Sequence, residues 1–290
     1  MQSISWDEDL LVSKVDAMRN RETSKYNYAS YVRQPLDQSL DVKSESVINI
    51  RTDIGCREKI CHWTYSVVDH FKLSRETVAI SMDLFDRFLA TQGNLCTSQS
   101  ALLASLTTLY IAIKVNEKKN IKISTLVSLS RNQFTAKDIE AMEMKILQDV
   151  GFLVQAPTAV EFIGHLISFL HADGSLLHHI CELSRYVAEL SICDSFFVDQ
   201  EKSAIALAAM LNVLEDDISY ERIPRVAREH FLHYITNRFN WFIGNAVAVN
   251  GCRDRLRHLK WEQEEKPRRT RQPNGKNRAQ SPTSAILESR

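Results

Sequence analysis

One stretch of this sequence, Ala101–Ile113, has no polar face when it is drawn as an α-helix. Its side chains are apolar or small all the way round, and Ser105, Thr107 and Thr108 add hydroxyl groups without a charge. A helix of this kind has to be surrounded by other helices, and its small residues let a neighbour pack closely. The sequence therefore predicts that this segment is the central helix of a helical bundle.

A second stretch has the same character. Ser203-Ala-Ile-Ala-Leu, at the start of Ala204–Leu214, matches Ser100-Ala-Leu-Leu-Ala at an offset of 103 residues. Each stretch is preceded by two predicted helices and followed by others. The chain is therefore expected to be all-α, with two tandem five-helix folds.

Apolar periodicity and the placement of the few Gly and Pro residues define the remaining helices. They are predicted at 54–71, 75–91, 98–116, 122–130, 136–150, 158–170, 175–193, 200–215 and 222–245. The domains predicted from this pattern are a flexible N-terminal segment (1–49), a first helical fold (50–155), a second helical fold (156–248) and a basic, disordered tail (249–290).

Charge and cysteine usage exclude several classes of protein. Lys plus Arg and Asp plus Glu both total 36, and the net charge is +6 over residues 251–290 but −4 over 51–250. Because residues 51–250 carry a net negative charge, they are poorly suited to binding nucleic acid. The six cysteines form no CxxC pair, which argues against a zinc cage or a secreted disulfide framework. Each is therefore predicted to be a small buried residue in a reducing compartment. No apolar stretch reaches the length of a membrane span.

Two charged residues stand out because of their surroundings. On a helical wheel Glu143 lies between Val150 and Leu147, inside the apolar face of the helix predicted at 136–150. A carboxylate at such a position costs free energy unless it is paired. Lys114 ends the central helix, where a cation also interacts favourably with the helix dipole. The two residues are either an internal ion pair or the charged part of a groove that receives another protein.

Several motifs, in order along the chain, resemble the landmarks of the cyclin box. They are Cys56–Trp63, Leu84–Leu89, Ala112–Lys114 and Met142–Leu147, followed by Ala156-Pro157-Thr158 with Glu161-Phe162 at the start of the second fold. The chain thus resembles a divergent cell-cycle cyclin with features of the A, B and D types. The motifs cover residues 50–165, and the helix pattern alone covers 166–245.

The resemblance implies a non-catalytic subunit that binds and activates a cyclin-dependent kinase as a heterodimer, without a cofactor or metal. It implies a role for each matching residue as well. The kinase-binding residues would be Lys114, Glu143, Val115, Leu147 and Phe152, and the residues that hold the box together would be Arg57, Asp86, Leu103 and Trp63.

The resemblance also implies an apolar patch that docks kinase substrates or inhibitors. Its residues would be Cys56, Ile60, Trp63, Leu102 and Leu129. Two departures from the family pattern weaken this expectation, because Lys59 interrupts the patch and His62 stands where the family has an Asp. The aspartate partner expected for Arg57 is thereby in question.

Signals at the two ends of the chain suggest regulation. Arg33-x-x-Leu36 fits the minimal destruction-box pattern, which would make a ubiquitin ligase a partner. The basic run Lys266–Arg271 resembles a nuclear-import signal, so the expected location is nucleus and cytoplasm.

Other classes of function find less support. The sequence has no HExxH, GxSxG or phosphate-binding glycine loop, so an enzyme is not expected. A cyclin-fold transcription factor would need a basic body and usually a zinc ribbon, and the first 50 residues contain no cysteine. A helical adaptor that acts without a kinase is the other alternative.

Overall fold

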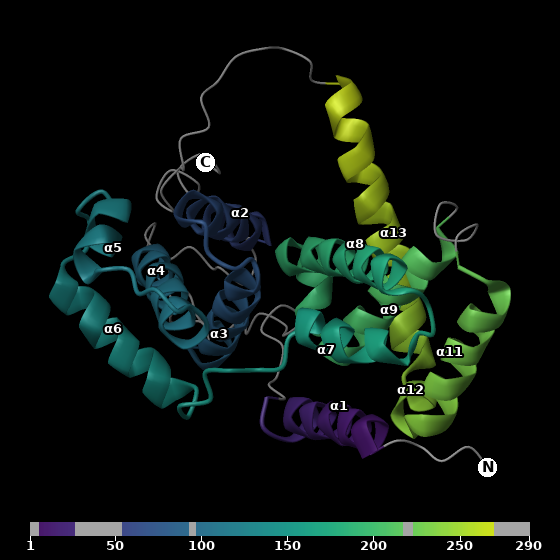
Figure 1. Ribbon diagram of the computed structural model, residues 1–290. Helices are drawn as coiled ribbons and strands as arrows, with labels where there is room; N and C mark the ends of the chain where they lie inside the picture. Colours follow the sequence, from purple (N-terminus) through teal and green to yellow (C-terminus); the bar gives the residue numbers. More distant parts are fainter. Residues whose placement is uncertain (1–5, 27–53, 93–96, 217–222, 270–290) are drawn as a thin grey trace, which may run out of the picture. The chain divides into compact units, whose positions relative to one another are not determined.

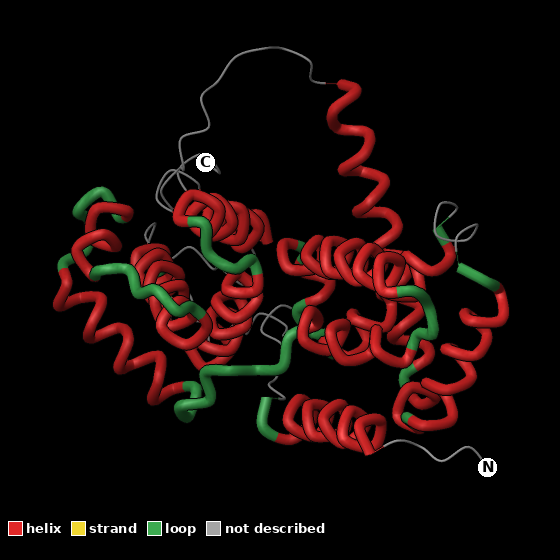
Figure 2. Tube along the Cα trace, viewed as in Figure 1, coloured by secondary structure: helices red, strands yellow, loops and turns green. Residues whose placement is uncertain are grey.

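The computed structural model describes residues 6–26, 54–92, 97–216 and 223–269. Every regular element in these ranges is a helix, as Figures 1 and 2 show, which confirms the all-α prediction. The chain divides into two compact units. The described part of the N-terminal unit comprises residues 54–92, 97–156 and 192–198, and that of the C-terminal unit comprises 6–26, 157–191, 199–216 and 223–269.

Five α-helices lie in the described part of the N-terminal unit before residue 156. They are α2 (Ile54–Phe71), α3 (Glu76–Gln92), α4 (Ser98–Asn116), α5 (Ile123–Leu129) and α6 (Ala136–Asp149). Helix α4 packs against both α3 and α6, and nearly all of Ala101–Ile113 is buried. The short helix η3 (Ser195–Phe197) packs against α2. The predicted central helix is therefore central in the structure.

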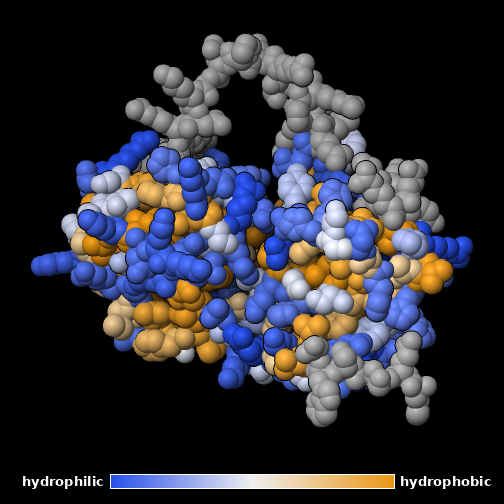
Figure 3. All heavy atoms as spheres, in the orientation of Figure 1, coloured by the Kyte–Doolittle hydropathy of each residue, from blue (hydrophilic) through white to orange (hydrophobic). Residues whose placement is uncertain are grey.

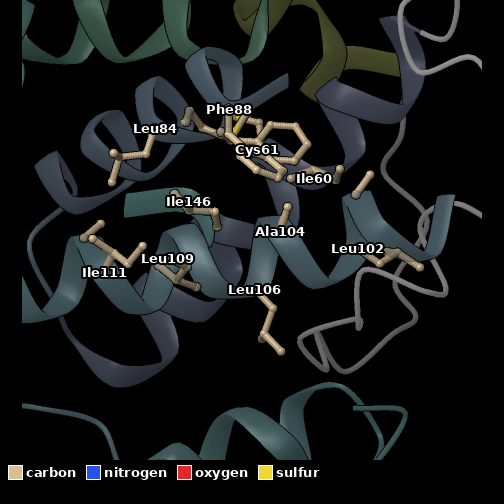
Figure 4. Close-up of a cluster of buried hydrophobic side chains, with 14 of the residues drawn as sticks. Ile60, Cys61, Leu84, Phe88, Leu102, Ala104, Leu106, Leu109, Ile111 and Ile146 are labelled. Carbon is tan, nitrogen blue, oxygen red and sulfur yellow. The ribbon is translucent and has the colours of Figure 1, made fainter. Parts of the chain in front are cut away.

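Apolar side chains from α2, α3, α4 and α6 meet in one core (Figure 4). Ile60, Phe88, Ala104 and Ile146 each come from a different helix, and each is fully or almost fully buried. Ala104 has the short side chain that allows the neighbouring helices to approach α4 closely. This tight packing gives α4 and α6 a defined relative position.

Helix α6 begins with a capping box. The side chain of Thr135 accepts a hydrogen bond from the backbone N–H of Asp138, and the carboxylate of Asp138 accepts one from the backbone N–H of Thr135. Thr135 donates hydrogen bonds to the Asp138 carboxylate from its backbone N–H and from its hydroxyl. Both lower the pKa of this carboxyl, and the backbone hydrogen bond has the larger effect. Such a cap fixes the first turn of the helix, so the register of α6 is set from its beginning.

The C-terminal unit is built around α9 (Lys202–Glu215), whose alanine-rich sequence is buried on all sides. Helices α7 (Ala159–Leu166) and α13 (Ala246–Arg269) pack against it. The remaining elements are α1 (Trp6–Ser24), η2 (Ile167–Phe169), α8 (Gly174–Cys193), α11 (Arg225–Arg238) and α12 (Asn240–Gly244). Cys193 and Ile192, at the end of α8, belong to the N-terminal unit.

Helix α1 joins the C-terminal unit through a polar network and a short apolar stripe. Its Arg19 forms an ion pair with Glu201 (2.7 Å) and donates to the hydroxyl of Ser203. Glu22 accepts a hydrogen bond from the backbone N–H of Ser203. Val12, Val15 and Met18 supply the buried stripe.

The structure corrects the bounds of two segments predicted at the ends of the chain. The segment 1–49 was predicted to be flexible, but residues 6–24 form α1 because ion pairs and a narrow stripe stabilise it. The tail was predicted to be disordered from residue 249, but α13 continues to residue 269. Its buried side chains Val249, Cys252 and Leu256 recur at helical spacing.

Within the described residues, none of the helices combines the length and apolar character that a membrane span requires.

Candidate functional site

The structure brings Lys114 and Glu143 together. Lys114 lies in the last turn of α4 and Glu143 lies in the middle of α6, and their side chains form an ion pair. The Lys114 ammonium also lies 4.2 Å from the centroid of the Tyr110 ring. The side chains remain 34% and 19% exposed. The internal pair considered from the sequence is thus present, and it also reaches the surface.

The apolar residues predicted around this pair differ in their exposure. Val115 and Leu147 are partly buried and pack against the core, whereas Phe152 is 62% exposed. The sequence analysis missed Met144, which is also exposed and lies three positions before Leu147 on α6. Residues at this spacing are neighbours on a helix. We call the five residues that the sequence predicts to bind a kinase the docking surface; they are Lys114, Glu143, Val115, Leu147 and Phe152.

Exposure of an apolar side chain is not by itself a sign of function. Figure 3 shows hydrophobic residues in patches between hydrophilic ones on one face of the molecule, which is usual for a protein surface. The backbone distinguishes Phe152, because its φ of 59° lies in the left-handed region. An aromatic residue rarely adopts this conformation, so the local structure holds Phe152 in place.

The turn at the end of α6 explains how Phe152 is held. The backbone N–H of Phe152 donates to the carbonyl of Leu147 (2.7 Å), and that of Gly151 donates to the carbonyl of Gln148 (3.0 Å). Gly151 has a φ of 63°. These are the two hydrogen bonds of a Schellman motif with glycine at its left-handed position.

Replacing Gly151 with alanine is expected to lower the free energy of unfolding by about 1 kcal/mol, because a Cβ atom disfavours a positive φ. Apart from residue 151 and its two chain neighbours, no residue has an atom within 4 Å of the added Cβ, so the cost comes from the backbone alone. Urea denaturation measures the change. Gly174→Ala, on α8, is the matched control, since its site is equally open and its φ is not positive. Equal effects of the two substitutions would refute the explanation.

Arg57 and Asp86 form a buried ion pair between α2 and α3. Two hydrogen bonds join them, from Nε to Oδ1 (2.9 Å) and from Nη2 to Oδ2 (2.8 Å). Arg57 Nη1 also donates to the carbonyl of Ile192 (2.8 Å). Asp86 is therefore the carboxylate partner of Arg57. Trp63 is buried and Leu103 packs against the same core, so the residues expected to hold the box together all belong to its interior.

The predicted substrate-docking patch does not form an exposed surface in the described residues. Cys56, Ile60, Trp63 and Leu102 are buried and belong to the hydrophobic core, while Leu129 is partly buried. Their helix faces point inward, toward the centre of the bundle, so these side chains stabilise the fold.

Other predicted features lie elsewhere. The Arg33–Leu36 pattern falls outside the described residues, as does the end of the basic run Lys266–Arg271. In the part of the chain that the structure describes, no three His, Cys, Asp or Glu side chains converge in a way that could hold a metal ion.

A protein-family model agrees with the landmarks of the N-terminal unit. The model of the cyclin N-terminal domain matches residues 22–155, which include all five helices from α2 to α6 and the pair of Lys114 with Glu143. Residues 22–155 of the chain belong to the cyclin family. The resemblance in the sequence motifs is thereby confirmed.

The chain has low sequence identity to curated cyclins of several types. It is 24% identical to the G2/mitotic-specific cyclin-B3 of Mus musculus over 158 residues, and 29% identical to the G2/mitotic-specific cyclin-B2 of Anguilla japonica over 154. It is 30% identical to cyclin-D3-3 of Arabidopsis thaliana over 167 residues. These matches cover 54%, 53% and 56% of this chain but 11%, 38% and 45% of the relatives.

Solved structures with a similar fold cover most of this chain. A viral cyclin from herpesvirus saimiri aligns with a TM-score of 0.63 and 16% identity, over 84% of this chain and 97% of that one. A chain of the CAK complex of Chaetomium thermophilum, bound to ATP-gamma-S, aligns with a TM-score of 0.51 and 19% identity, over 91% and 81%. The cyclin fold therefore extends beyond the N-terminal domain. Cyclins are non-catalytic regulatory subunits of kinases, which supports the prediction that this chain is not an enzyme.

Proposed function

We propose that this cyclin binds a cyclin-dependent protein kinase through the docking surface and activates it. The observation that carries the proposal is the partly exposed ion pair of Lys114 with Glu143, because Glu143 lies on α6, the helix that ends three residues before the exposed Phe152. Aromatic side chains are enriched at the centre of protein interfaces, and charged groups add specificity and fix the register of the partners.

The strength of the ion pair suits this role. A partly exposed pair contributes little to the stability of the free chain, so its side chains can form hydrogen bonds with a partner at small cost. Phe152 and Met144 supply apolar area that is exposed in the free chain and would be buried in a complex. The tight turn after α6 reduces the entropy that Phe152 loses on binding.

Activation would follow from selective binding to one conformation of the kinase. Protein kinases need an internal Lys–Glu ion pair, whose Glu lies on a mobile helix, before they transfer phosphate. A cyclin that binds the active position of this helix more tightly shifts the population toward it. The chain itself contributes no catalytic group in this mechanism.

The comparisons support this proposal at the level of the family. Several relatives are named as G2/mitotic-specific cyclins, which favours a role in cell division. The basic run Lys266–Arg271 favours entry into the nucleus. Substrates, inhibitors and a ubiquitin ligase remain proposed partners, as the resemblance implies.

Co-purification with a cyclin-dependent kinase tests the proposal. The full chain is expected to form a 1:1 complex and to raise histone-kinase activity. Lys114→Ala and Glu143→Ala are each expected to weaken binding by roughly 30-fold or more, as residues at the centre of an interface do. The matched control removes a different exposed ion pair, Arg225–Glu229 on α11, and should leave binding unchanged.

Two outcomes would contradict the proposal in different ways. A kinase that neither binds nor gains activity would leave a helical adaptor without a kinase as the function. A kinase that binds the Lys114→Ala and Glu143→Ala variants as tightly as the wild type would show that the pair is purely internal.

A further inference from the structure

Two cysteines that are far apart in the sequence meet in the N-terminal unit. Cys61 lies on α2 and Cys193 is the last residue of α8, 132 positions later, yet their sulfur atoms are 2.8 Å apart. Both thiols are free. His62 adds a third group, because its Nδ1 atom lies 4.0 Å from the sulfur of Cys193. We call Cys61, His62 and Cys193 the thiol cluster.

Arg57 fixes the backbone that carries Cys193. Its Nη1 donates to the carbonyls of Ile192 and Cys193, at 2.8 and 3.3 Å. Arg57 also precedes Cys61 by one helical turn on α2, so both residues lie on the same face of that helix. The contact between the two thiols is therefore built by the buried framework of the box.

The two thiols differ in their access to solvent. Cys61 is fully buried, whereas Cys193 is partly exposed. The His62 side chain beside it is 59% exposed. A small reagent from solution therefore reaches Cys193 more readily than Cys61.

The two thiols also differ in acidity. The hydrogen bond with Cys61 lowers the pKa of Cys193 to about 6, and His62 and Arg57 act in the same direction. Burial raises the pKa of Cys61 well above its usual value. The charged or titratable groups that face the cluster are Arg57 and His62 on α2, Glu58 beside His62, and Asp86 on α3. Cys193 is thus the nucleophilic thiolate and Cys61 is the protonated neighbour.

We propose that Cys61 and Cys193 form an oxidisable dithiol that hydrogen peroxide converts into an intramolecular disulfide. The Cys193 thiolate attacks one peroxide oxygen, the O–O bond breaks, and the leaving hydroxide takes a proton to become water. Cys193 is then a sulfenic acid. The sulfur of Cys61 attacks the sulfur of Cys193, the S–O bond breaks, and the hydroxide that leaves takes the Cys61 proton as a second water. Two thiols lose two electrons, and one peroxide gains them.

The geometry favours the second step. A disulfide requires a separation of about 2.05 Å between the sulfur atoms, so the two atoms have to approach by less than 1 Å. The product would tie the end of α8 covalently to α2, at the place where Arg57 already holds it. Oxidation would thereby make this part of the box more resistant to unfolding. The inference concerns the free chain and does not depend on kinase binding.

The test treats the reduced full chain with hydrogen peroxide at pH 7 and maps the cysteines by non-reducing peptide mass spectrometry. The expected product is one peptide pair joined through Cys61 and Cys193. The Tm should rise by about 5–10 °C, since the disulfide closes a long loop, and dithiothreitol should reverse the shift. The rate of Cys193 alkylation by iodoacetamide should fall as the pH drops through about 6.

Single substitutions distinguish the thiol that attacks peroxide from the thiol that completes the disulfide. Cys61→Ala should stop disulfide formation and leave Cys193 as a sulfenic acid that dimedone captures, while Cys193→Ser should abolish both products. Cys181 is the matched control, because it is also partly exposed but burial raises its pKa. Cys181→Ser should leave the crosslink unchanged, and circular dichroism establishes that each variant is folded.

Three results would overturn the proposal. The first is that the crosslink does not form in the folded wild type, or joins other cysteines. The second is that Cys193 reacts with peroxide no faster than Cys181 does. The third is that folded Cys61→Ala gives no dimedone adduct at Cys193.

Discussion

Replacing Arg57 with alanine is expected to lower the free energy of unfolding by about 3–5 kcal/mol, because it leaves a buried charge without its ion-pair partner. The carboxylate of Asp86 loses two short hydrogen bonds, and both side chains of the pair are almost fully buried. The carbonyl of Ile192 loses a donor as well. Urea denaturation of the full chain measures the effect.

A second ion pair in the same unit provides the control. Arg75 forms two similar hydrogen bonds with Asp69 (3.1 and 2.9 Å), but both side chains are half exposed. Arg75→Ala is expected to cost less than about 1 kcal/mol. The double variant Arg57→Met with Asp86→Leu should recover part of the loss, because it removes both buried charges. Similar losses for Arg57→Ala and Arg75→Ala would show that burial does not determine the cost.

The second large effect concerns two phenylalanines of opposite exposure. Phe85→Ala is expected to destabilise the chain by about 3–5 kcal/mol, since Phe85 is fully buried on α3 and its removal leaves a cavity. Phe152→Ala removes the same atoms from an exposed side chain and should change stability by less than about 0.5 kcal/mol. Chemical denaturation of the two variants, side by side, checks this difference.

The two substitutions should affect kinase affinity in the reverse order, with Phe152→Ala having the larger effect. Phe152→Ala is expected to reduce affinity by roughly 30-fold or more, as loss of an interface anchor does. Phe85→Ala, measured at a temperature where it remains folded, should bind within a few-fold of the wild type. If Phe152→Ala binds normally and is strongly destabilised, Phe152 is a structural residue and does not belong to the docking surface.

The strong patterns of the sequence were sufficient to predict most of the fold. The segments predicted at 54–71 and 98–116 coincide with α2 and α4. The first has a clear apolar periodicity, the second is apolar or small all the way round, and both have distinct ends. Figure 1 shows where these helices lie in the fold. In contrast, α1 and α13 bury narrow stripes among many charged residues. Their positions depend on contacts with residues far along the chain, such as that of Arg19 with Glu201, which local patterns do not contain.

The candidate site was predictable in part. The wheel position of Glu143 indicated that it needs a partner, and its ion pair with Lys114 agrees with that reasoning. The contact between Cys61 and Cys193 was not predictable, because each cysteine by itself looks like a small apolar residue. The patch around Trp63 failed as a surface because its side chains face the core. Exposure is a property of packing, which sequence motifs do not specify.

The attachment of α1 to the C-terminal unit has a consequence for synthesis of the chain. Arg19 cannot form its ion pair until Glu201, which lies 182 residues later, has been synthesised. At about 5–20 residues per second, the ribosome needs roughly 10–35 s to deliver it. During this interval the N-terminal unit can begin to form while α1 has no docking site. A truncation that removes α1 would therefore destabilise the C-terminal unit, which is the part of the protein that the ribosome completes last.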